Sequence, residues 1–565
     1  MSNSHEIVLR QRLGAILKQR RPQGGMAVIN GIIEDPNASA LIQAMQPEEL
    51  HTLMQDIGWS DCHELLRYAS EEQFQGLTAI NAWVDREFQP QHLEALIGLA
   101  AAADPEAVER LFESFEHETS GLYLLSRVMI FNLPAEPNDQ DEVRELGEVL
   151  VTPDNMFWLV FPDGDDFFPQ VKYFIDGMYA LDNLAMVSLL KTLVFEDKDT
   201  LQAQARQFRQ ARLRTMGFPA LEETDHLLDY VNPVKLKNEI RAKLEQSPQL
   251  VVGQDTLLPA LVDWKLGDVP FLQLALQSMG GARVRDEVVQ GMAYLGNAVI
   301  VASSGGDLFQ PAARDLGLNR AVSLMNLGLE FLSDKDPKVG ARALGRVWPK
   351  TLFRIGHSRL LALKGRATKL ARKQGTELGF NLFDPPLREV IAGCRSDVPQ
   401  YFVGLDDESS LEFREFRCLE DVSKADVVLE QAEGIAEFCD RVFKLDVAVL
   451  AQFVEQNQRP MVTHTTLMAT ALVNGLRGAD SLFQPVPVGR IPDVMDVVLL
   501  VDEGGQRVLN PRLQQAVAGF VSAERDPFAA ALFDLSLSKL EDVFHRLPRG
   551  LVPEAKFMAG ALLVE

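Results

Sequence analysis

Apolar residues recur at helical spacing through the first part of the chain, in segments of about ten to fifteen residues. Most segments open with a helix-start signal, either a proline or a small polar residue. These signals stand at Pro47, Ser60, Ser70, Pro90 and Asp104-Pro105. The pattern predicts stacked, superhelical units of short helices, and it requires no strand in this part of the chain.

Two places favour small β-hairpins. The short apolar runs Glu148–Val151 and Met156–Phe161 flank the turn sequence Thr-Pro-Asp-Asn. A second pair of runs, Val497–Val501 and Arg507–Leu509, flanks the sequence Asp-Glu-Gly-Gly-Gln. The predicted fold class is therefore mostly α, with one or two small hairpins.

Breaks in the periodicity predict three domains. The breaks lie at Leu133–Asp141, which is rich in proline and polar residues, and at Asp384-Pro385-Pro386. The predicted domains are a short-helix repeat domain (1–133), a middle helical domain (143–383) with a hairpin near 148–161 and basic helices at 335–373, and a mainly helical C-terminal domain (387–565) with an acidic stretch at 406–440.

Two resemblances bear on the fold. A rhythm of leucine pairs and Pro-Glu-Glu-Leu runs through Ala40 to Leu77, ALIQAMQPEELHTLMQDIGWSDCHELLRYASEEQFQGL. It resembles the cytoplasmic amino-terminal domain of MgtE-type magnesium transporters and the related helical units of flagellar rotor proteins, over residues 1–130. The transporter pore is absent, so magnesium transport is not implied. The whole chain, through RQARLRTMGFPALEE (Arg209–Glu223) and MAYLGNAVIVA (Met292–Ala302), also resembles an uncharacterised family of long bacterial proteins, a likeness that implies no function.

The composition is that of a globular protein that stays in solution. The 565 residues are 47% hydrophobic and 24% charged, with a formal net charge of −25. Four cysteines stand far apart, so neither a zinc site nor a disulfide framework is indicated. Charges interrupt the apolar residues of the first 21 positions, which favours an amphipathic helix over a signal peptide. The uncharged stretch Val288–Gly306 contains polar residues and glycines and is expected to be a buried helix. We therefore expect a cytoplasmic protein with no membrane span and no cofactor.

The charge reverses in the middle of the chain. Lys335–Lys373 holds twelve Lys and Arg residues and one acid, Asp336. Cations at every fourth position fall along one side of a helix. The predicted anion- or partner-binding residues are Lys338, Arg342, Arg346, Lys350, Arg354 and Arg359. Pro349 should divide the segment into two helices, Lys338–Trp348 and Lys350–Lys373, with Trp348 and Phe353 packed inward.

Three kinds of anionic partner fit this segment. The stretch Asp406–Asp440, with twelve acids and three bases, could neutralise it within the chain or between subunits. An acidic surface of another protein could do the same. Nucleic acid or a nucleotide is the third partner, because arginine presents a planar fork of donors to phosphate.

The remaining candidates have simpler explanations. The arginines 206, 209, 212 and 214 are expected to complement a helix dipole before Gly217, a C-cap residue. Asp163–Asp166 is expected to be a polar turn, because Phe168 occupies the position where a calcium loop requires glycine. His357 is expected to be a packed helical histidine and His464 a capping or core residue. Ser536 and Lys539 match Ser-x-x-Lys, a pattern short enough to arise by chance.

The sequence contains no motif for a phosphate loop, a dinucleotide-binding turn, a zinc protease or a serine hydrolase. No catalytic or metal-binding residue is predicted. We expect a non-catalytic interaction or regulatory protein, a scaffold or adaptor, that binds another protein through helical surfaces. The alternatives are a nucleic-acid or nucleotide-binding regulator that uses residues 338–373, and an enzyme of unrecognised type. The oligomeric state is not predicted.

Overall fold

The computed structural model describes residues 8–9, 12–16, 24–84, 86–133, 136–162, 164, 166–245, 269–280, 282–305, 308, 311–373, 382–443, 462–524, 527–558 and 560–565. Over these ranges the fold is mostly α with small antiparallel sheets, so the predicted fold class is confirmed. Of the amphipathic helix expected at residues 1–21, only 8–9 and 12–16 are described, and both stretches are helical. Within the described ranges, no helix combines the length and the apolar character needed to cross a membrane.

The chain folds into two compact units. Unit 1 consists of Met1–Asp229, Asn238–Met325 and Leu332–Arg354, and unit 2 of Tyr230–Lys237, Asn326–Phe331 and Ile355–Glu565. Three helices contribute residues to both units: α15 (Pro233–Glu245), α19 (Pro311–Ser333) and α21 (Pro349–Lys373). The three-domain boundaries drawn from the sequence stay a prediction.

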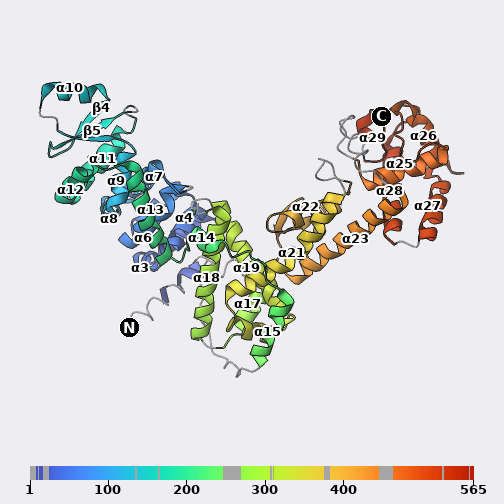
Figure 1. Ribbon diagram of the computed structural model, residues 1–565, viewed down its shortest axis with the longest axis horizontal. Coiled ribbons are helices and arrows are strands. Elements are labelled where there is room, and N and C mark those ends of the chain that lie inside the picture. The colour runs from blue at the N-terminus through green and yellow to red at the C-terminus, as the bar shows by residue number, and fades with distance from the viewer. Residues whose placement is uncertain are drawn as a thin grey trace. The chain divides into compact units, whose positions relative to one another are not determined.

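Helices build most of unit 1, and most of them are short (Figure 1). They are α2 (Gly25–Ile33), α3 (Ala38–Gln43), α4 (Pro47–Ile57), α5 (His63–Leu66), α6 (Glu71–Asn81), α7 (Pro90–Ala103), α8 (Pro105–Glu113), α9 (His117–Leu125), α10 (Pro137–Glu145), α11 (Phe168–Leu181), α12 (Asn183–Leu193), α13 (Lys198–Thr215), α14 (Leu221–Thr224), α17 (Pro270–Gln277), α18 (Ala282–Ser304) and α20 (Pro337–Leu344). Neighbours in sequence pack against one another, as α7 does on α8 and α11 on α12. The stretch Val288–Gly306 lies in α18 as far as Ser304 and buries most of its apolar side chains, as expected, while Gly306 lies outside the described residues.

The helix starts follow the predicted signals with one exception. Ser70 caps α6, because its hydroxyl accepts a hydrogen bond from Gln73 N while the Gln73 side chain accepts one from Ser70 N. Ser60, expected to cap a helix, instead lies inside the 3-10 turn η2 (Trp59–Asp61), and α5 begins after Cys62. Gly58, with a φ of 105°, ends α4, and the chain forms the 3-10 turn directly after it.

The expectation that the first part needs no strand was wrong. The strands β1 (Trp83–Val84) and β2 (Glu87–Phe88) form a two-stranded sheet. The predicted hairpin of β4 (Glu148–Val151) and β5 (Phe157–Phe161) is confirmed, and β3 (Met129–Asn132) pairs with the other edge of β5. Strand β5 is buried throughout, which agrees with its apolar sequence FWLVF. The helix α10 begins within the stretch 133–141, where a linker was expected.

Unit 2 is also helical. Its further helices are α22 (Leu387–Arg395), α23 (Leu419–Phe443), α25 (His464–Arg477), α26 (Ile491–Val498), α27 (Pro511–Glu524), α28 (Pro527–Arg546) and α29 (Ala555–Met558), with 3-10 turns η4 (Val403–Leu405) and η5 (Val488–Arg490). The predicted hairpin near 497–509 is confirmed as β8 (Leu499–Val501) and β9 (Arg507–Leu509), and a second sheet pairs β6 (Gln400–Phe402) with β7 (Phe413–Glu415). Helix α25 packs on α26, α27 and α28, and Phe438 of α23 contacts Phe533 of α28 edge to face.

Candidate functional site

The basic segment forms two helices, as predicted, although the first is shorter than expected. The carboxylate of Asp336 caps α20 by accepting hydrogen bonds from the backbone N–H groups of Lys338 and Val339, at 2.8 and 3.4 Å. Helix α20 ends at Leu344, before Gly345, and α21 starts at Pro349. Glycine is a poor helix former, and a residue before proline is kept out of the helical region, so residues 345–348 form a turn instead of continuing α20.

The turn changes the environment of one aromatic residue. The side chain of Trp348 is 78% exposed, so the expectation that it packs inward was wrong. The expectation for Phe353, which is fully buried on α21, is confirmed. Helical periodicity assigns a face only to residues that lie on the helix, and Trp348 lies in the turn that precedes one.

The predicted site residues differ in their surroundings. Lys338, Arg346 and Lys350 are exposed, and Arg342 is half-buried. Within the described part of the chain, Lys338, Arg342 and Lys350 make no ion pair. The structure therefore leaves Lys338, Arg342 and Lys350 without an ion pair in its described part, and Trp348 is exposed. We call these four residues, together with Arg346, the basic corner.

Two predicted site residues contact other groups. The guanidinium of Arg354 lies 3.9 Å from the Asp229 carboxylate and donates from Nε to the Asp229 carbonyl at 3.3 Å. The guanidinium of Arg359 lies 4.7 Å from the centroid of the Phe331 ring, within cation–π range. Both side chains are half-buried and already engaged in these contacts, so they are not counted in the basic corner.

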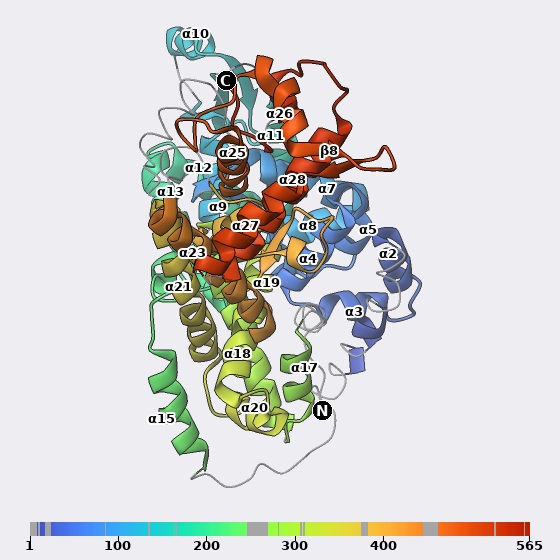
Figure 2. The same ribbon diagram turned by 90° about the vertical axis from the view of Figure 1, so that its right-hand side faces the viewer.

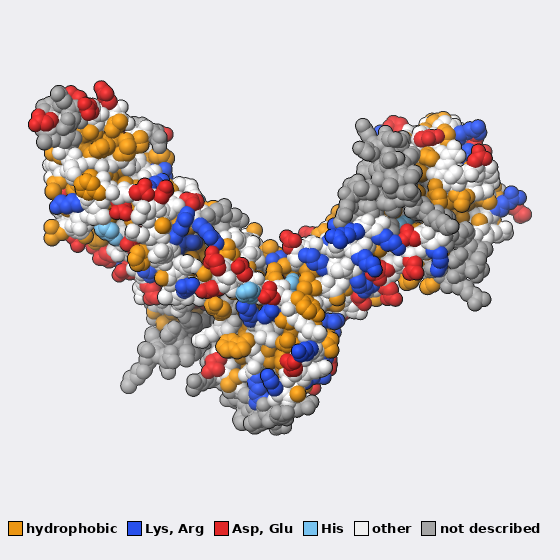
Figure 3. Space-filling view, in the orientation of Figure 1, with side chains coloured by type: hydrophobic (Ala, Val, Ile, Leu, Met, Phe, Trp, Pro, Cys, Tyr) orange, Lys and Arg blue, Asp and Glu red, His pale blue; other side chains and the backbone are white. Residues whose placement is uncertain are grey.

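The later cations of the segment pair with α23. Arg366 donates two parallel hydrogen bonds to Glu433, at 3.0 and 2.8 Å, and it also pairs with Asp426. The hydrogen bonds to Glu433 raise the pKa of Arg366. Lys373 pairs with Asp440. For Arg366 and Lys373 the expected neutralisation by the stretch 406–440 is confirmed, and Figure 3 shows Lys and Arg side chains beside Asp and Glu side chains over this part of unit 2.

Other acids of the stretch 406–440 pair with cations of the same stretch. Arg414 contacts Asp421 at 2.6 Å and Asp406 at 3.3 Å, and Lys424 contacts Asp406 at 2.9 Å. The hydrogen bond from Lys424 is the main cause that lowers the pKa of Asp406. Part of the stretch therefore pairs internally, while Asp426, Glu433 and Asp440 pair with Arg366 and Lys373 of the basic segment.

Close backbone contacts fix the basic corner against its neighbours. A Cβ atom at Gly340 of α20 would lie 3.3 Å from the Phe271 ring of α17. A Cβ atom at Gly291 of α18 would lie 3.2 Å from the ring of Pro349. Figure 2 shows α20 beside α17, which agrees with the first of these contacts. The cations of the corner therefore project from a packed support.

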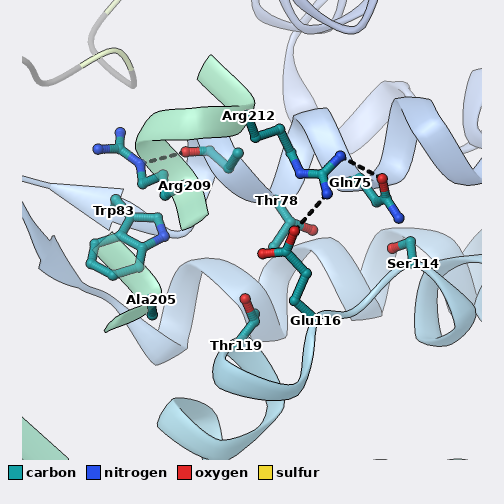
Figure 4. A pocket seen from close by; sticks show the side chains of 10 residues that line it. Gln75, Thr78, Trp83, Ser114, Glu116, Thr119, Ala205, Arg209 and Arg212 are labelled. Atoms are coloured by element: carbon teal, nitrogen blue, oxygen red, sulfur yellow. Dashed lines mark hydrogen bonds and ion pairs between the residues drawn. The ribbon is translucent and has the colours of Figure 1, made fainter. Parts of the chain in front are cut away.

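The second arginine run does more than complement a helix dipole (Figure 4). Arg212 of α13 donates to Gln75 of α6 and to Glu116, just before α9, both at 2.5 Å. Arg209 donates from Nε to the Ala79 carbonyl at 2.7 Å, and its guanidinium lies 5.4 Å from the Trp83 ring centroid. These bonds fasten α13 to α6, α9 and β1. The outer two arginines of the run reach exposed acids, Arg206 to Glu87 and Arg214 to Glu223.

A cavity of about 20 Å³ lies between these side chains. The buried hydroxyl of Thr78 lines it and has no hydrogen-bond partner within the described residues. Space of this size holds about one water molecule. The arrangement therefore favours a structural contact between helices over a ligand site.

Unit 2 contains a buried polar cluster that sequence reasoning missed. Asp384 accepts a hydrogen bond from the Thr465 hydroxyl at 2.8 Å and pairs with Lys539. Lys539 also donates to Thr465 at 3.0 Å, whereas Ser536 donates to the Leu532 carbonyl. Ser536 and Lys539 therefore bond to different partners. The only hint in the sequence was a polar run, Thr463–Thr466, at the start of an apolar helix.

The two predicted histidines are buried, as expected for core residues. His464 is the first residue of α25, and neither of its ring nitrogens has a hydrogen-bond partner in the described part of the protein. Burial lowers the pKa of His464 to about 4. Asp163 and Asp165 of the expected turn lie outside the described residues. Among the residues that are described, no group of three or more His, Cys, Asp or Glu side chains is arranged to hold a metal ion.

The fold and these contacts define a mostly α-helical protein with an exposed basic corner. Compared with known protein families, residues 7–564 match a family of unknown function, DUF6178, and the chain belongs to this family. This agrees with the likeness of the whole chain to an uncharacterised family. Neither the curated proteins nor the solved structures contain a match. The resemblance of residues 1–130 to MgtE-type transporters receives no support.

Proposed function

We propose that the protein is a non-catalytic interaction protein that binds an acidic surface of another protein through its basic corner. The observation that carries this proposal is the pairing within the basic segment. Arg366 and Lys373 are neutralised by α23, whereas Lys338, Arg342 and Lys350 make no ion pair in the described part of the chain. Cations grouped in this way attract an acidic partner and set its orientation.

Trp348 gives the corner an apolar anchor. Tryptophan and arginine are the residues that most often dominate protein–protein binding energy, especially where a large side chain enters a partner pocket. An exposed Trp348 beside Arg346 and Lys350 supplies both kinds of contact. We therefore expect the indole to contribute to binding in addition to the charges.

Nucleic acid is the second candidate, because an exposed aromatic ring among cations can also stack on a base. One observation favours a protein partner. Single-strand binding sites generally combine several stacking rings along a basic groove, and the corner offers one ring.

A binding assay with defined polyanions tests the proposal. The full-length protein is titrated with a fluorescent polyglutamate peptide and, separately, with single-stranded DNA of the same number of charges, at 50 and 200 mM salt. We expect polyglutamate to bind, more weakly at the higher salt concentration. Lys338→Glu/Arg342→Glu/Lys350→Glu should weaken this binding about tenfold or more, because three attractive charges become repulsive.

A matched variant controls for the change in net charge. Lys191, Lys198 and Arg549 are also exposed, and they lie away from the corner in sequence. Lys191→Glu/Lys198→Glu/Arg549→Glu changes the net charge by the same amount, so its binding should stay within about twofold of the wild type. Equal losses in the two triple variants would refute a local site. Tighter binding of DNA than of polyglutamate, lost in Trp348→Ala, would favour the nucleic-acid alternative.

A further inference from the structure

A second and larger cavity lies in unit 1, between α7, α9 and α11. Its volume is about 290 Å³, close to the lower limit for small-molecule sites. Its walls are mainly apolar, with Ile97, Gly98 and Ala101 from α7 and Pro169 and Tyr173 from α11. Tyr173 is about half exposed, so its ring is accessible to a ligand. These walls suit an aromatic or aliphatic group.

The polar residues Glu94, Tyr123 and Gln170 also line the cavity. Glu94 receives two hydrogen bonds from Arg127, from Nε to Oε1 at 2.9 Å and from Nη2 to Oε2 at 2.8 Å. The hydroxyl of Tyr123 donates to Glu94 Oε1 at 3.3 Å. Arg127 in turn lies 3.6 Å from the centroid of the Phe167 ring. The carboxylate is therefore held in one orientation, and its negative charge is already matched by Arg127.

The hydrogen-bond capacity of Glu94 is not filled. A carboxylate oxygen can accept two hydrogen bonds, and Oε2 accepts one, from Arg127. Glu94 lines the cavity and Arg127 is not among its lining residues, so a molecule in the cavity can approach Glu94 without meeting Arg127. Because the pair is neutral as a whole, it suits a neutral donor better than a free cation.

The helix α7 has no side chain at Gly98, where it lines the cavity. A Cβ atom placed on Gly98 meets no atom within 4 Å. Glycine in the middle of a helix costs about 1 kcal/mol relative to alanine, so α7 forgoes stability at this position. A larger side chain at Gly98, or at Ala101 one turn later, would occupy the cavity.

From these observations we propose that the cavity binds a small, mainly apolar, neutral molecule with one hydrogen-bond donor, and that this donor forms a hydrogen bond to Glu94. A flat ring with an N–H or O–H group on its edge has this chemistry. The ring packs on Tyr173 and the aliphatic wall, and the donor completes the bonding of Glu94. This site is independent of the basic corner.

Indole is a suitable probe, because it is flat and has one N–H donor, and 1-methylindole has a similar shape without the donor. Saturation-transfer NMR on the full-length protein, followed by titration, measures both. We expect indole to bind and 1-methylindole to bind about fivefold more weakly or worse, because a buried acceptor then stays unpaired. Absence of indole binding contradicts the proposal, and equal binding of the two probes refutes the role of Glu94.

Variants locate the binding. Ala101→Met places a long side chain in the cavity, and the neighbouring Ala102→Met, also exposed on α7 but outside the cavity, is its matched control. Indole binding should fall at least tenfold in Ala101→Met and remain within twofold in Ala102→Met. Gly98→Leu gives a second obstruction at a position without steric conflict, and thermal unfolding verifies that each variant is folded. Unchanged binding in both obstructed variants overturns the site.

Discussion

The two aromatic residues Trp348 and Phe353 show what a residue pattern can predict. Phe353 lies inside a regular helix, so the spacing of its apolar neighbours correctly placed it in the core. Trp348 lies in a four-residue turn, where helical spacing carries no information about direction. The predicted break at Pro349 was correct, but the first helix was predicted to reach Trp348, whereas it ends at Leu344. Because the helix end was predicted too late, Trp348 was wrongly assigned to a buried helix face.

His464 gives a prediction about pH. Burial holds its folded-state pKa at about 4, below the value of about 6.5 in an unfolded chain. The ring is neutral in both states above pH 6.5, and only the unfolded state takes up the proton between pH 6.5 and 4. The stability is therefore complete above pH 6.5 and is lost as the pH falls towards 4. At pH 4.5 the loss is about 2 to 3 kcal/mol.

Replacing the imidazole tests this assignment. His464→Leu removes two buried nitrogens that have no partner in the described part of the protein, so we expect unchanged or higher stability at pH 7.5. At pH 5 the variant should exceed the wild type by a larger margin than at pH 7.5. Urea denaturation at several pH values measures both differences. A constant difference across the range would show that His464 does not cause the pH dependence.

At the scale of elements, local signals were sufficient for many helices. Pro47, Ser70, Pro90 and Asp104-Pro105 all mark helix starts, because proline and side-chain caps act through the nearest backbone groups. The two-residue strands β1 and β2 were missed, because two residues are too few to show an alternating pattern. Strand β3 was missed for a different reason, since its partner β5 is distant in sequence.

Arg212 gives a prediction about how elements are joined. It bonds α13 to Gln75 and Glu116, and its planar fork reaches both partners at once. Arg212→Lys keeps the charge but loses this geometry, so we expect a loss of about 1 to 2 kcal/mol in unfolding free energy. Arg214→Lys, on the same helix but with an exposed partner, should cost less than about 0.5 kcal/mol. Chemical denaturation compares the two variants. Equal losses would show that the bonds of Arg212 contribute no more to stability than the exposed ion pair of Arg214.

At the scale of the whole molecule, the sequence identified the charge reversal but not which cations of the segment are paired. The sequence showed twelve cations in one segment of an otherwise acidic chain, because a local excess of charge can be counted without a structure. Which of them are paired depends on distant residues such as Glu433 and Asp229, which only the folded chain brings near. The cavity beside Glu94 had no signal in the sequence, because its lining residues have no special spacing and its form depends on the packing of three helices.

In each unit burial lowers the pKa of a histidine, His51 in unit 1 and His464 in unit 2, so acid should destabilise both units. In unit 1, His51 donates from Nε2 to Asn81 at 2.9 Å and accepts from Arg314 at Nδ1 at 3.1 Å, an assignment required because arginine can only donate. Burial, with a smaller effect of Arg314, lowers the pKa of His51 to about 3. Unit 1 therefore loses stability as the pH falls from 6.5 towards 3, and unit 2 loses it through His464.

Hydrogen exchange followed by mass spectrometry can observe the two units separately. After correction for intrinsic exchange rates, we expect peptides from α4 and α6 and peptides from α25 to lose protection together between pH 7 and pH 5. In His464→Leu, α25 should keep its protection at pH 5 while α4 and α6 lose theirs, because His51 is unchanged. Protection restored in both regions would mean that the units unfold as one cooperative body, and loss in both regions would assign the acid sensitivity of unit 2 to another group.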